Sequence, residues 1–302
     1  MSSLNPGFFD LVSQRCPNLR RLHLSHADLT LTHLPANVEF VSVSQSVISW
    51  KCFIAPRYDE DGARVILARL REVELLNTEL TEGSLAALPD SVRRLRIRDC
   101  RLPTAEESFN YTVLEPGLDN ERHGRLPITD LDLSQDTEIS LGTAMNFISY
   151  CPRLTVLRLN DCVFRDDFFN DDVVTALLFM IGTVCNELRF LEELEADRML
   201  SDNDDDNVML ENFDAAMFGT NLRRLSIAGW PITDATGCDI PRKLTNLQSL
   251  NVSGCEQLTD VSFSQFANLS HTLRHLNVRS TNISNDTVDL LKLHMPECEI
   301  VQ

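Results

Sequence analysis

The chain has 302 residues, of which 43% are hydrophobic, so it has enough apolar side chains to bury a core and disorder is not expected. Its formal net charge is −18, from 27 basic and 45 acidic residues. This balance argues against a nucleic-acid-binding surface, because phosphate binding depends on a high density of lysine and arginine. The longest apolar runs, such as residues 173–181, are too short to span a bilayer.

Cysteine usage and the first residues indicate the compartment. The chain contains nine cysteines, and its start has no basic region followed by an apolar stretch. We therefore predict no secretory signal and no membrane anchor. Free thiols are expected in a reducing compartment, which places the protein in the cytoplasm, the nucleus or both.

The main sequence signal is an internal repeat with apolar residues at positions 0, 3, 5, 8 and 10. In the first copy, Leu19 stands at position 0, and Leu22 and Leu24 stand at positions 3 and 5. The copies at Ile128 and Leu191 match less well. Successive copies start 19 to 37 residues apart, and a spacing of about 20–29 residues is typical of leucine-rich repeats. About ten copies begin at Leu19, Val38, Leu70, Val92, Ile128, Leu154, Leu191, Leu222, Leu247 and Leu273.

Strand geometry explains this spacing. Side chains alternate along a strand, so the apolar residues at positions 3 and 5 point into a core while their neighbours point out. Positions 8 and 10 turn the chain back into that core. One copy cannot bury its own apolar face, so the copies must stack. We predict an α/β leucine-rich-repeat solenoid formed by one domain, residues 1–302. It would be a curved horseshoe with a parallel sheet on the concave face and helices and loops on the convex face.

The segments between the predicted strands follow in chain order. Residues 8–15 are expected to be the convex half that precedes the first copy, and residues 171–184 and 286–293 are expected to be helices. The segments at Leu34-Pro35 and Leu88-Pro89 are too short for a full helix, and proline favours extended or turn conformations there. Long spacers at about 49–66, 103–127 and 200–218 are expected to form loops, which often carry function.

The outward-pointing side chains of the predicted strands alternate in charge. Neighbouring parallel strands lie about 4.8 Å apart, so residues at equivalent positions are direct neighbours. We predict a partner-binding concave face made by Glu72, Glu74, Arg94, Arg96, Arg98, Asp130, Asp132, Arg158, Glu193, Glu195, Asp197, Asn251, His275, Asn277 and Arg279. Phe40, Leu76 and Val156 are apolar residues expected to face outward on the same surface, as candidate anchors.

Two interpretations of this charged face remain open at the sequence level. The alternation can be a ladder of intramolecular salt bridges that keeps a charged sheet soluble and contributes little stability. It can also be a recognition surface whose arginines bind acidic or phosphorylated groups of a protein partner. The two roles are compatible.

The middle of the chain is strongly acidic, with 16 acidic residues and three arginines in residues 160–214. The acidic loop contains Asp202, Asp204, Asp205 and Asp206. A calcium site is disfavoured, because Asn207 stands where such a loop needs glycine and Phe213 where it needs a bidentate glutamate. A solvated loop, or one that binds a basic partner, is favoured.

Other reactive residues have structural explanations. Cys100, Cys162 and Cys255 stand at position 8 and are expected to be core thiols. His23 and His26 lie close together, but no third metal ligand is evident. No glycine-rich phosphate loop or catalytic motif with supporting context is found. We therefore expect no cofactor, no metal and no enzymatic activity.

The segments Cys151-Pro152-Arg153-Leu154 and Leu250-Asn251-Val252-Ser253-Gly254-Cys255 resemble the cysteine-containing class of leucine-rich repeats. This class is typical of F-box/leucine-rich-repeat proteins, the substrate receptors of cullin–RING ubiquitin ligases. The resemblance implies a substrate-binding module, with a cullin-ligase adaptor bound through a segment that is not evident here, since no F-box motif is seen. The alternatives are a ubiquitin-independent scaffold or regulatory adaptor and, least favoured, an enzyme.

Overall fold

The computed structural model describes residues 2–3, 7–29, 34–35, 37–48, 57–58, 64–65, 69–80, 88–101, 126–135, 141–162, 182, 185, 188–199 and 214–302. The chain divides into two compact units, an N-terminal unit of Met1–Pro152 and a C-terminal unit of Arg153–Gln302. Each unit is described by itself. The expectation of one domain over residues 1–302 stays a prediction.

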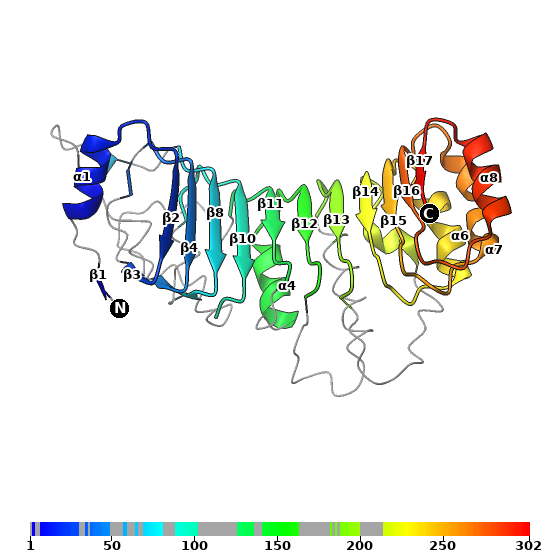
Figure 1. Ribbon diagram of the computed structural model, residues 1–302, viewed down its shortest axis with the longest axis horizontal. Coiled ribbons are helices and arrows are strands. Elements are labelled where there is room, and N and C mark those ends of the chain that lie inside the picture. Colours follow the sequence, from blue (N-terminus) through cyan, green and yellow to red (C-terminus); the bar gives the residue numbers. More distant parts are fainter. Residues whose placement is uncertain are drawn as a thin grey trace. The chain divides into compact units, whose positions relative to one another are not determined.

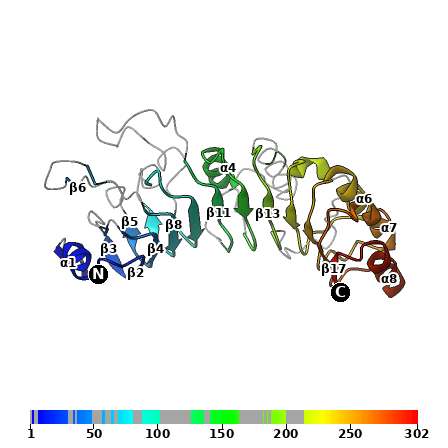
Figure 2. The same ribbon diagram turned by 90° about the horizontal axis from the view of Figure 1, so that it is seen from above.

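The N-terminal unit begins with helix α1 (Gly7–Arg15), which matches the predicted convex segment. A parallel sheet follows, and each of its strands pairs with the strand of the next repeat (Figure 1). Its strands are β2 (Arg21–Ser25), β4 (Phe40–Ser44), β8 (Glu72–Leu76), β10 (Arg94–Arg98) and β11 (Asp130–Asp132). Helix α4 (Leu141–Ser149) lies against one side of this sheet, next to β11 (Figure 2).

Two smaller sheets in this unit were not predicted. A second parallel ladder joins β1 (Ser2–Ser3), which precedes α1, to three short strands that follow main strands. These are β3 (Ala27–Leu29), β5 (Val47–Ile48) and β9 (Glu79–Leu80). The spacer at 49–66, expected to be a loop, contains an antiparallel pair of β6 (Arg57–Tyr58) and β7 (Arg64–Val65). Almost all of the spacer at 103–127 lies outside the described residues.

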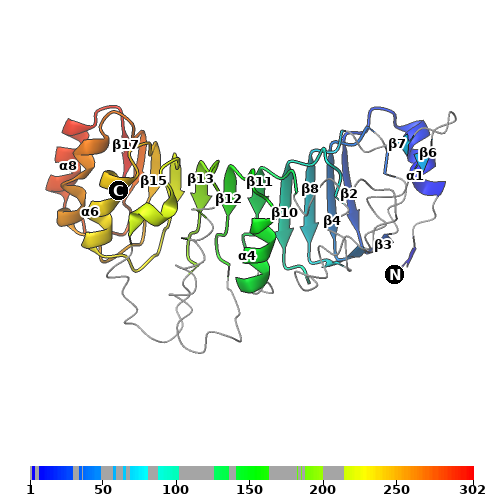
Figure 3. The ribbon, with the colours of Figure 1, turned by 180° about the vertical axis from the view of Figure 1, so that it is seen from behind.

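The C-terminal unit repeats the same arrangement. Its parallel strands are β12 (Val156–Arg158), β13 (Glu193–Glu195), β14 (Arg224–Ser226), β15 (Ser249–Asn251), β16 (His275–Asn277) and β17 (Glu299–Val301). The last of them, β17, lies beyond the ten predicted copies. Helical segments connect the later strands and lie on one side of the sheet (Figure 3). They are η3 (Ala215–Phe218), α6 (Asp234–Lys243), α7 (Asp260–Phe263), η4 (Phe266–Leu269) and α8 (Asn285–His294).

The predicted helix at 286–293 is therefore confirmed as α8, with one more residue at each end. Its first turn is capped by the hydroxyl of Ser284, which accepts a hydrogen bond from the backbone N–H of Thr287. The predicted helix at 171–184 lies almost entirely outside the described residues. In the spacer at 200–218, the described part contains the 3-10 helix η3.

Positions 3 and 5 of the repeat form the core, as predicted. In the N-terminal unit, Val41, Val73 and Leu95 are fully buried, and in the C-terminal unit Leu250 and Leu276 are equally inaccessible. Burial of each such side chain contributes about 1.5–3 kcal/mol, which is why the apolar pattern determines the fold. Position 8 holds the predicted core thiols, since Cys100, Cys162 and Cys255 have no exposed surface.

A left-handed residue ends the strand segment of every repeat. Position 7 has a positive φ angle in all ten copies, at His26, Gln45, Asn77, Asp99, Gln135, Asp161, Arg198, Gly229, Gly254 and Ser280. In seven of these copies its backbone N–H bonds to the carbonyl at position 6 of the next repeat, as from Gln45 to Leu76 (3.0 Å) and from Gly229 to Ser253 (2.8 Å). The turn is therefore part of the hydrogen-bonded ladder, which explains why residues other than glycine tolerate this conformation.

On the helical side, polar side chains connect successive repeats. The carboxylate of Asp234 in α6 accepts hydrogen bonds from the backbone N–H (2.8 Å) and hydroxyl (2.6 Å) of Thr259, which caps α7. Asp260 in α7 accepts in the same way from the backbone N–H of Ser284, the cap of α8, at 2.7 Å. Each helix start is thus held by the carboxylate of the preceding helix.

Candidate functional site

The predicted binding residues lie on the side of each sheet that faces away from the core. We call this side, made by positions 2, 4 and 6 of each repeat, the outward strand face. In the N-terminal unit the strand register aligns Glu72, Arg94 and Asp130 in one row, which we call row 1. The same register aligns Glu74, Arg96 and Asp132 in row 2. The sequence therefore predicted correctly which side chains are neighbours.

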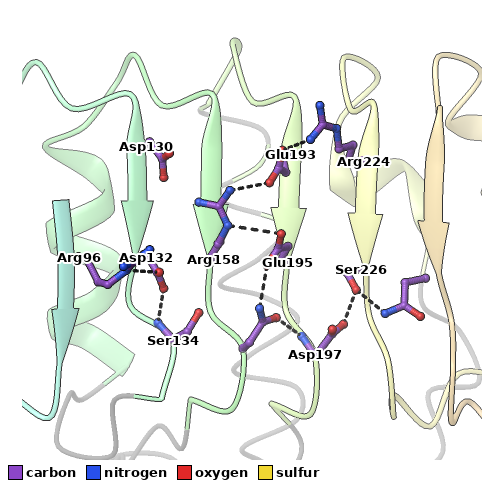
Figure 4. A network of polar contacts seen from close by, with 12 residues as sticks. Arg96, Asp130, Asp132, Ser134, Arg158, Glu193, Glu195, Asp197, Arg224 and Ser226 are labelled. Atoms are coloured by element: carbon purple, nitrogen blue, oxygen red, sulfur yellow. Dashed lines mark hydrogen bonds and ion pairs between the residues drawn. The ribbon is translucent and has the colours of Figure 1, made fainter. Parts of the chain in front are cut away.

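In both rows the central arginine lies between two carboxylates. The Nε of Arg94 is 2.8 Å from Oδ2 of Asp130, and its Nη1 is 3.6 Å from Oε2 of Glu72. In row 2, Nε of Arg96 is 2.8 Å from Oδ2 of Asp132 (Figure 4). Its Nη1 is 3.0 Å from Oε1 of Glu74. Row 2 is more enclosed, with the Asp132 side chain 5% exposed. The ladder of intramolecular salt bridges is thus present.

The acidic groups of row 2 are held in their ionised form. Burial acts to raise the pKa of Asp132, but hydrogen bonds from Ser134 and from the guanidinium of Arg96 outweigh it and lower that pKa. For Glu74, burial likewise opposes ionisation, while hydrogen bonds from Arg96 and Ser42 lower the pKa. The same neighbours raise the pKa of Arg96 against its own desolvation. Row 2 is therefore fully charged at neutral pH.

Arg98, the third arginine of β10, is less firmly paired. Its Nη2 lies 3.8 Å from Oδ2 of Asp132, a carboxylate that already binds Arg96. Its buried Nε has no hydrogen-bond partner among the residues that the structure describes. Of the three arginines of β10, Arg98 therefore keeps the most unused hydrogen-bonding capacity.

The outward strand face of the C-terminal unit contains a second network (Figure 4). Glu193 lies between two arginines, with Nη2 of Arg158 2.7 Å from its Oε1 and Nη1 of Arg224 3.0 Å from its Oε2. Arg158 also approaches Glu195, at 3.4 Å. Asn160 donates a hydrogen bond to Glu195 at 2.9 Å, which continues the network along the strands.

Asp197, predicted on this face, organises the adjoining turns. Its Oδ1 accepts hydrogen bonds from the hydroxyl of Ser226 (2.6 Å) and from the backbone N–H of Ala228 (2.7 Å). Ser226 in turn accepts from the side-chain amide of Asn251 at 2.8 Å. Arg224, Asn160 and Ser226 were not among the predicted site residues, although positions 2, 4 and 6 of their copies would have identified them.

The last strands offer more accessible polar groups. His275 lies 3.1 Å from the carboxylate of Glu299 through its Nδ1. The side-chain oxygen of Asn277 accepts the backbone N–H of Arg279 at 3.2 Å. The Arg279 side chain is exposed, and it makes no ion pair within residues 214–302, all of which the structure describes.

The predicted apolar anchors differ in accessibility. Leu76 and Val156 are partly exposed. Phe40 lies on the outward strand face but is only 5% exposed, so the prediction that it is an accessible anchor is wrong. The guanidinium of Arg21 lies 4.1 Å above its ring, and His23 covers another side of it with ring centroids 5.1 Å apart.

Metal and thiol chemistry have little support in the part of the chain that the structure describes. There, no three His, Cys, Asp or Glu side chains are grouped so that they could hold a metal ion. Burial raises the pKa of the Cys255 and Cys185 thiols to about 12, which disfavours the nucleophilic thiolate. The acidic loop with Asp202, Asp204, Asp205 and Asp206 lies outside the described residues.

The helices in the described residues are all too short or too polar to cross a membrane.

Comparison with known proteins supports the repeat architecture. A family model of the leucine-rich repeat matches residues 243–262 and 269–289, which include β15, β16 and the start of α8. The chain has a leucine-rich-repeat fold. No curated protein matches its sequence.

Two solved structures share the leucine-rich-repeat fold with this chain. One is an internalin, inlF, from Listeria monocytogenes, with 13% sequence identity and a TM-score of 0.51; the match covers 93% of this chain and 73% of the internalin. The other is a chain of the Rad7 and Elc1 complex in yeast, with 15% identity and a TM-score of 0.54; the match covers 98% of this chain and 75% of that one. At such identities the likeness concerns the fold alone, and leucine-rich repeats indicate a module for protein–protein interaction.

Proposed function

We propose that this leucine-rich-repeat protein is a non-catalytic recognition module that binds a protein partner on its outward strand face. The observation that supports it best is the ordering of that face, where charged side chains on successive strands hold one another in fixed positions. Arg94 and Arg96, for example, each bridge two carboxylates. Side chains that are ordered before binding lose less conformational entropy when a partner arrives.

The salt bridges themselves do not account for this arrangement through stability alone. Exposed ion pairs contribute about 0–1 kcal/mol each, so row 1, whose Arg94 side chain is 52% exposed, stabilises the fold only weakly. Alternating charges do, however, define a pattern of potential that a partner with the opposite pattern can match. We therefore treat the ladder and the recognition surface as two roles of the same residues.

Charge inversion of row 1 separates these roles. The triple variant Glu72→Arg, Arg94→Glu and Asp130→Arg retains an alternating row in which each neighbouring pair is of opposite charge. We expect its stability to change by no more than about 1 kcal/mol, because the Arg94 side chain is half exposed and the pairs re-form with reversed sign. We expect its protein partners, isolated by affinity purification from native extract, to be lost.

Two further proteins complete this experiment. The single variant Arg94→Glu reverses one charge and places a third carboxylate between Glu72 and Asp130. It should lose its protein partners and should also be less stable than the native protein. A surface control, Asp289→Asn on α8, should keep the partner set of the native protein. If the inverted row captures the same partners as the native chain, the outward strand face of the N-terminal unit is not the binding surface.

The more specific role that we propose is the substrate-binding part of a cullin–RING ubiquitin ligase. Its support is the resemblance of the segments around Cys151 and Cys255 to F-box/leucine-rich-repeat proteins, and a structural neighbour that comes from a protein complex. The test is whether a cullin adaptor copurifies with the protein, and whether it remains bound to the row 1 inversion. An adaptor absent from every preparation would contradict this role and leave recognition itself untouched.

An adaptor without a ubiquitin-related role is the alternative, favoured by the 16 acidic residues and three arginines in residues 160–214. In that case a basic partner would bind the acidic loop. Its binding should weaken steeply as salt rises from about 0.05 to 0.5 M, because screening acts strongly on exposed charges. It should also disappear when Asp202, Asp204, Asp205 and Asp206 are changed to asparagine.

A further inference from the structure

The first two strands of the N-terminal sheet carry a cluster that differs from the charged rows. Strand register places Arg21 beside Phe40 and His23 beside Ser42 on the outward strand face. We call Arg21, His23 and Phe40 the Arg21 platform. None of these residues belongs to row 1 or row 2.

The phenylalanine ring forms the base of the platform. The guanidinium carbon of Arg21 lies 4.1 Å from the ring centroid, and the His23 ring is tilted by 54° at a centroid distance of 5.1 Å. Phe40 is nearly buried, at 5% exposure, whereas Arg21 and His23 are exposed. A cation–π contact of this kind is worth about 0.5–1 kcal/mol at an exposed site. It holds the guanidinium over the ring, and a ring face accepts none of the hydrogen bonds that the N–H groups donate to a carboxylate.

None of the residues that the structure describes neutralises the charge of Arg21. Among the described residues, neither Arg21 nor His23 has a carboxylate within ion-pair distance. The adjacent Arg20 differs, because its Nε is 3.3 Å from Oε1 of Glu39.

The carboxylates on β8, the strand next to β4, are also occupied. Glu72 pairs with Arg94 and Glu74 pairs with Arg96. An anion that approaches Arg21 therefore displaces no carboxylate of the described residues, whereas an anion that approaches Arg94 or Arg96 must compete with two carboxylates. Of these arginines, Arg21 is the one that can bind an external anion at the lowest cost.

We propose that the Arg21 platform binds the carboxylate of an aspartate or glutamate in an extended segment of a protein partner. The planar guanidinium can donate two parallel hydrogen bonds to one carboxylate, and the exposed His23 ring lies beside it as a further polar contact. A single permanent cation matches the single charge of a carboxylate better than the double charge of a phosphate. The proposal rests on the proposed recognition role of the outward strand face, but it uses none of the row residues.

The test uses peptides, so that the partner need not be known. A displayed library of random peptides is selected on the full chain, and a selected peptide is synthesised with its acidic residue and with the matching amide. We expect a fixed acidic position in the selected peptides. Fluorescence anisotropy should show about tenfold weaker binding for the amide peptide, and for the acidic peptide on Arg21→Gln, as loss of one charge-assisted contact predicts. The two changes together should cost no more than either alone.

Matched variants identify the interaction. Arg20→Gln removes a neighbouring but paired arginine and should bind the peptide like the native chain. Arg21→Lys keeps the charge but loses the planar fork, and should give an intermediate affinity. Arg21 is exposed, so both of its variants should keep the native circular dichroism spectrum and melting temperature.

Three outcomes would overturn the proposal: no acidic consensus in the selected peptides, equal binding to Arg21→Gln, or binding only when the acidic residue is replaced by phosphoserine. The row 1 inversion, tested on the same peptide, separates the two hypotheses. Peptides that depend on row 1 but not on Arg21 contradict the platform alone. If the peptides depend on Arg21 and the cellular partners are unaffected by the row 1 inversion, only the binding role of row 1 is contradicted.

Discussion

Asp132 is the acidic residue of the outward strand face that is most enclosed by its partners. Its Oδ1 accepts the backbone N–H of Ser134 at 3.0 Å, and its Oδ2 accepts Nε of Arg96 at 2.8 Å. Removal of the Asp132 charge leaves Arg96 with one carboxylate instead of two. Because the Asp132 carboxylate is nearly buried, water replaces it poorly. Residues of this kind decide whether a charged surface is also a stable one.

We therefore expect Asp132→Asn to reduce the free energy of unfolding at pH 7 by about 1–3 kcal/mol, as for loss of a buried charge-assisted hydrogen bond. The folded pKa of Asp132 lies below its usual value of about 4. Ionised Asp132 thus stabilises the fold above that value, and this contribution is lost as the pH falls through the lower folded pKa. Urea unfolding of both proteins at pH 7 and pH 3 should show the difference shrinking in acid, with exposed Asp289→Asn as the neutral control.

At the left-handed position 7, replacing glycine by alanine should lower stability, whereas in a helix the same replacement usually raises it. At Gly254, with φ of +73°, an added Cβ would meet its nearest atom, the backbone N of Gly229, at 3.5 Å, which is ordinary contact. The cost of Gly254→Ala is therefore conformational, about 1–2 kcal/mol. Asparagine, which tolerates this conformation, should cost less. Gly142→Ala in α4, where a Cβ meets nothing within 4 Å, should leave the melting temperature unchanged or raise it.

At the scale of elements, the helical side of the C-terminal unit depends on carboxylates that reach the start of the next helix. Asp234 satisfies two donors of Thr259, and Asp260 satisfies the backbone of Ser284. Burial opposes ionisation of Asp234, but the hydrogen bonds from Thr259 and Ser262 outweigh it and lower its pKa. A helix as short as α7, Asp260–Phe263, is not stable by itself, so these contacts determine its position.

Asp234→Ala should consequently loosen α7 more than it affects α6, where it resides. We expect a loss of about 1–2 kcal/mol in unfolding free energy, comparable to removal of a helix cap. Amide hydrogen exchange should show the extra exposure at Thr259 and Val261, at the start of α7. Equal acceleration throughout α6, with no change at Thr259, would indicate that the carboxylate acts only within its own helix.

The repeat spacing predicted the strands and their register, because the hydrophobic effect acts on every copy in the same way. Even the weak copies at Ile128 and Leu191 are followed by strands, β11 and β13. The sequence did not predict position 7, since only two of its ten residues, Gly229 and Gly254, are glycines. Nor did it predict that Phe40 is covered, because that depends on where the long side chain of Arg21 lies.

The binding site was predictable only in part, for a related reason. Register brings Glu74, Arg96 and Asp132 into one row, which the spacing alone implies. Which arginine remains available to a ligand depends on side-chain conformation. That conformation pairs Arg94 and Arg96 fully and leaves Arg21 and Arg98 with unused hydrogen-bonding capacity. Sequence reasoning selected the arginines from a charge alternation that begins at Glu72 on β8, and therefore missed Arg21 on β2.

At the scale of the whole molecule, the two compact units raise the question of whether they unfold together. Copies in a repeat protein are stabilised mainly by their neighbours, so an uninterrupted array unfolds as one cooperative system when its interfaces are strong. The single-domain prediction therefore has a direct thermodynamic consequence. The buried cysteines provide probes in both units: Cys100 and Cys151 in one, and Cys162, Cys185 and Cys255 in the other.

Pulsed alkylation across a urea gradient measures this. In the native state we expect Cys16, which is exposed, to react. These five of the six buried thiols among the described residues are protected by inaccessibility, and at Cys151, Cys185 and Cys255 also by the raised pKa values that burial causes. If residues 1–302 are one domain, both sets should become reactive at the same urea concentration. Mass spectrometry that finds one set modified well before the other would establish two independently unfolding units.

The alternating rows also constrain how such a surface can change in evolution. An inner member such as Arg94 faces an opposite charge on each side, so reversing it alone places three like charges in line. A neighbouring substitution then restores only one of the two contacts, and a third is needed to restore the row. The charges of one row should therefore change together. Across related sequences, charges at equivalent positions of adjacent repeats should covary, even where the repeats have otherwise diverged.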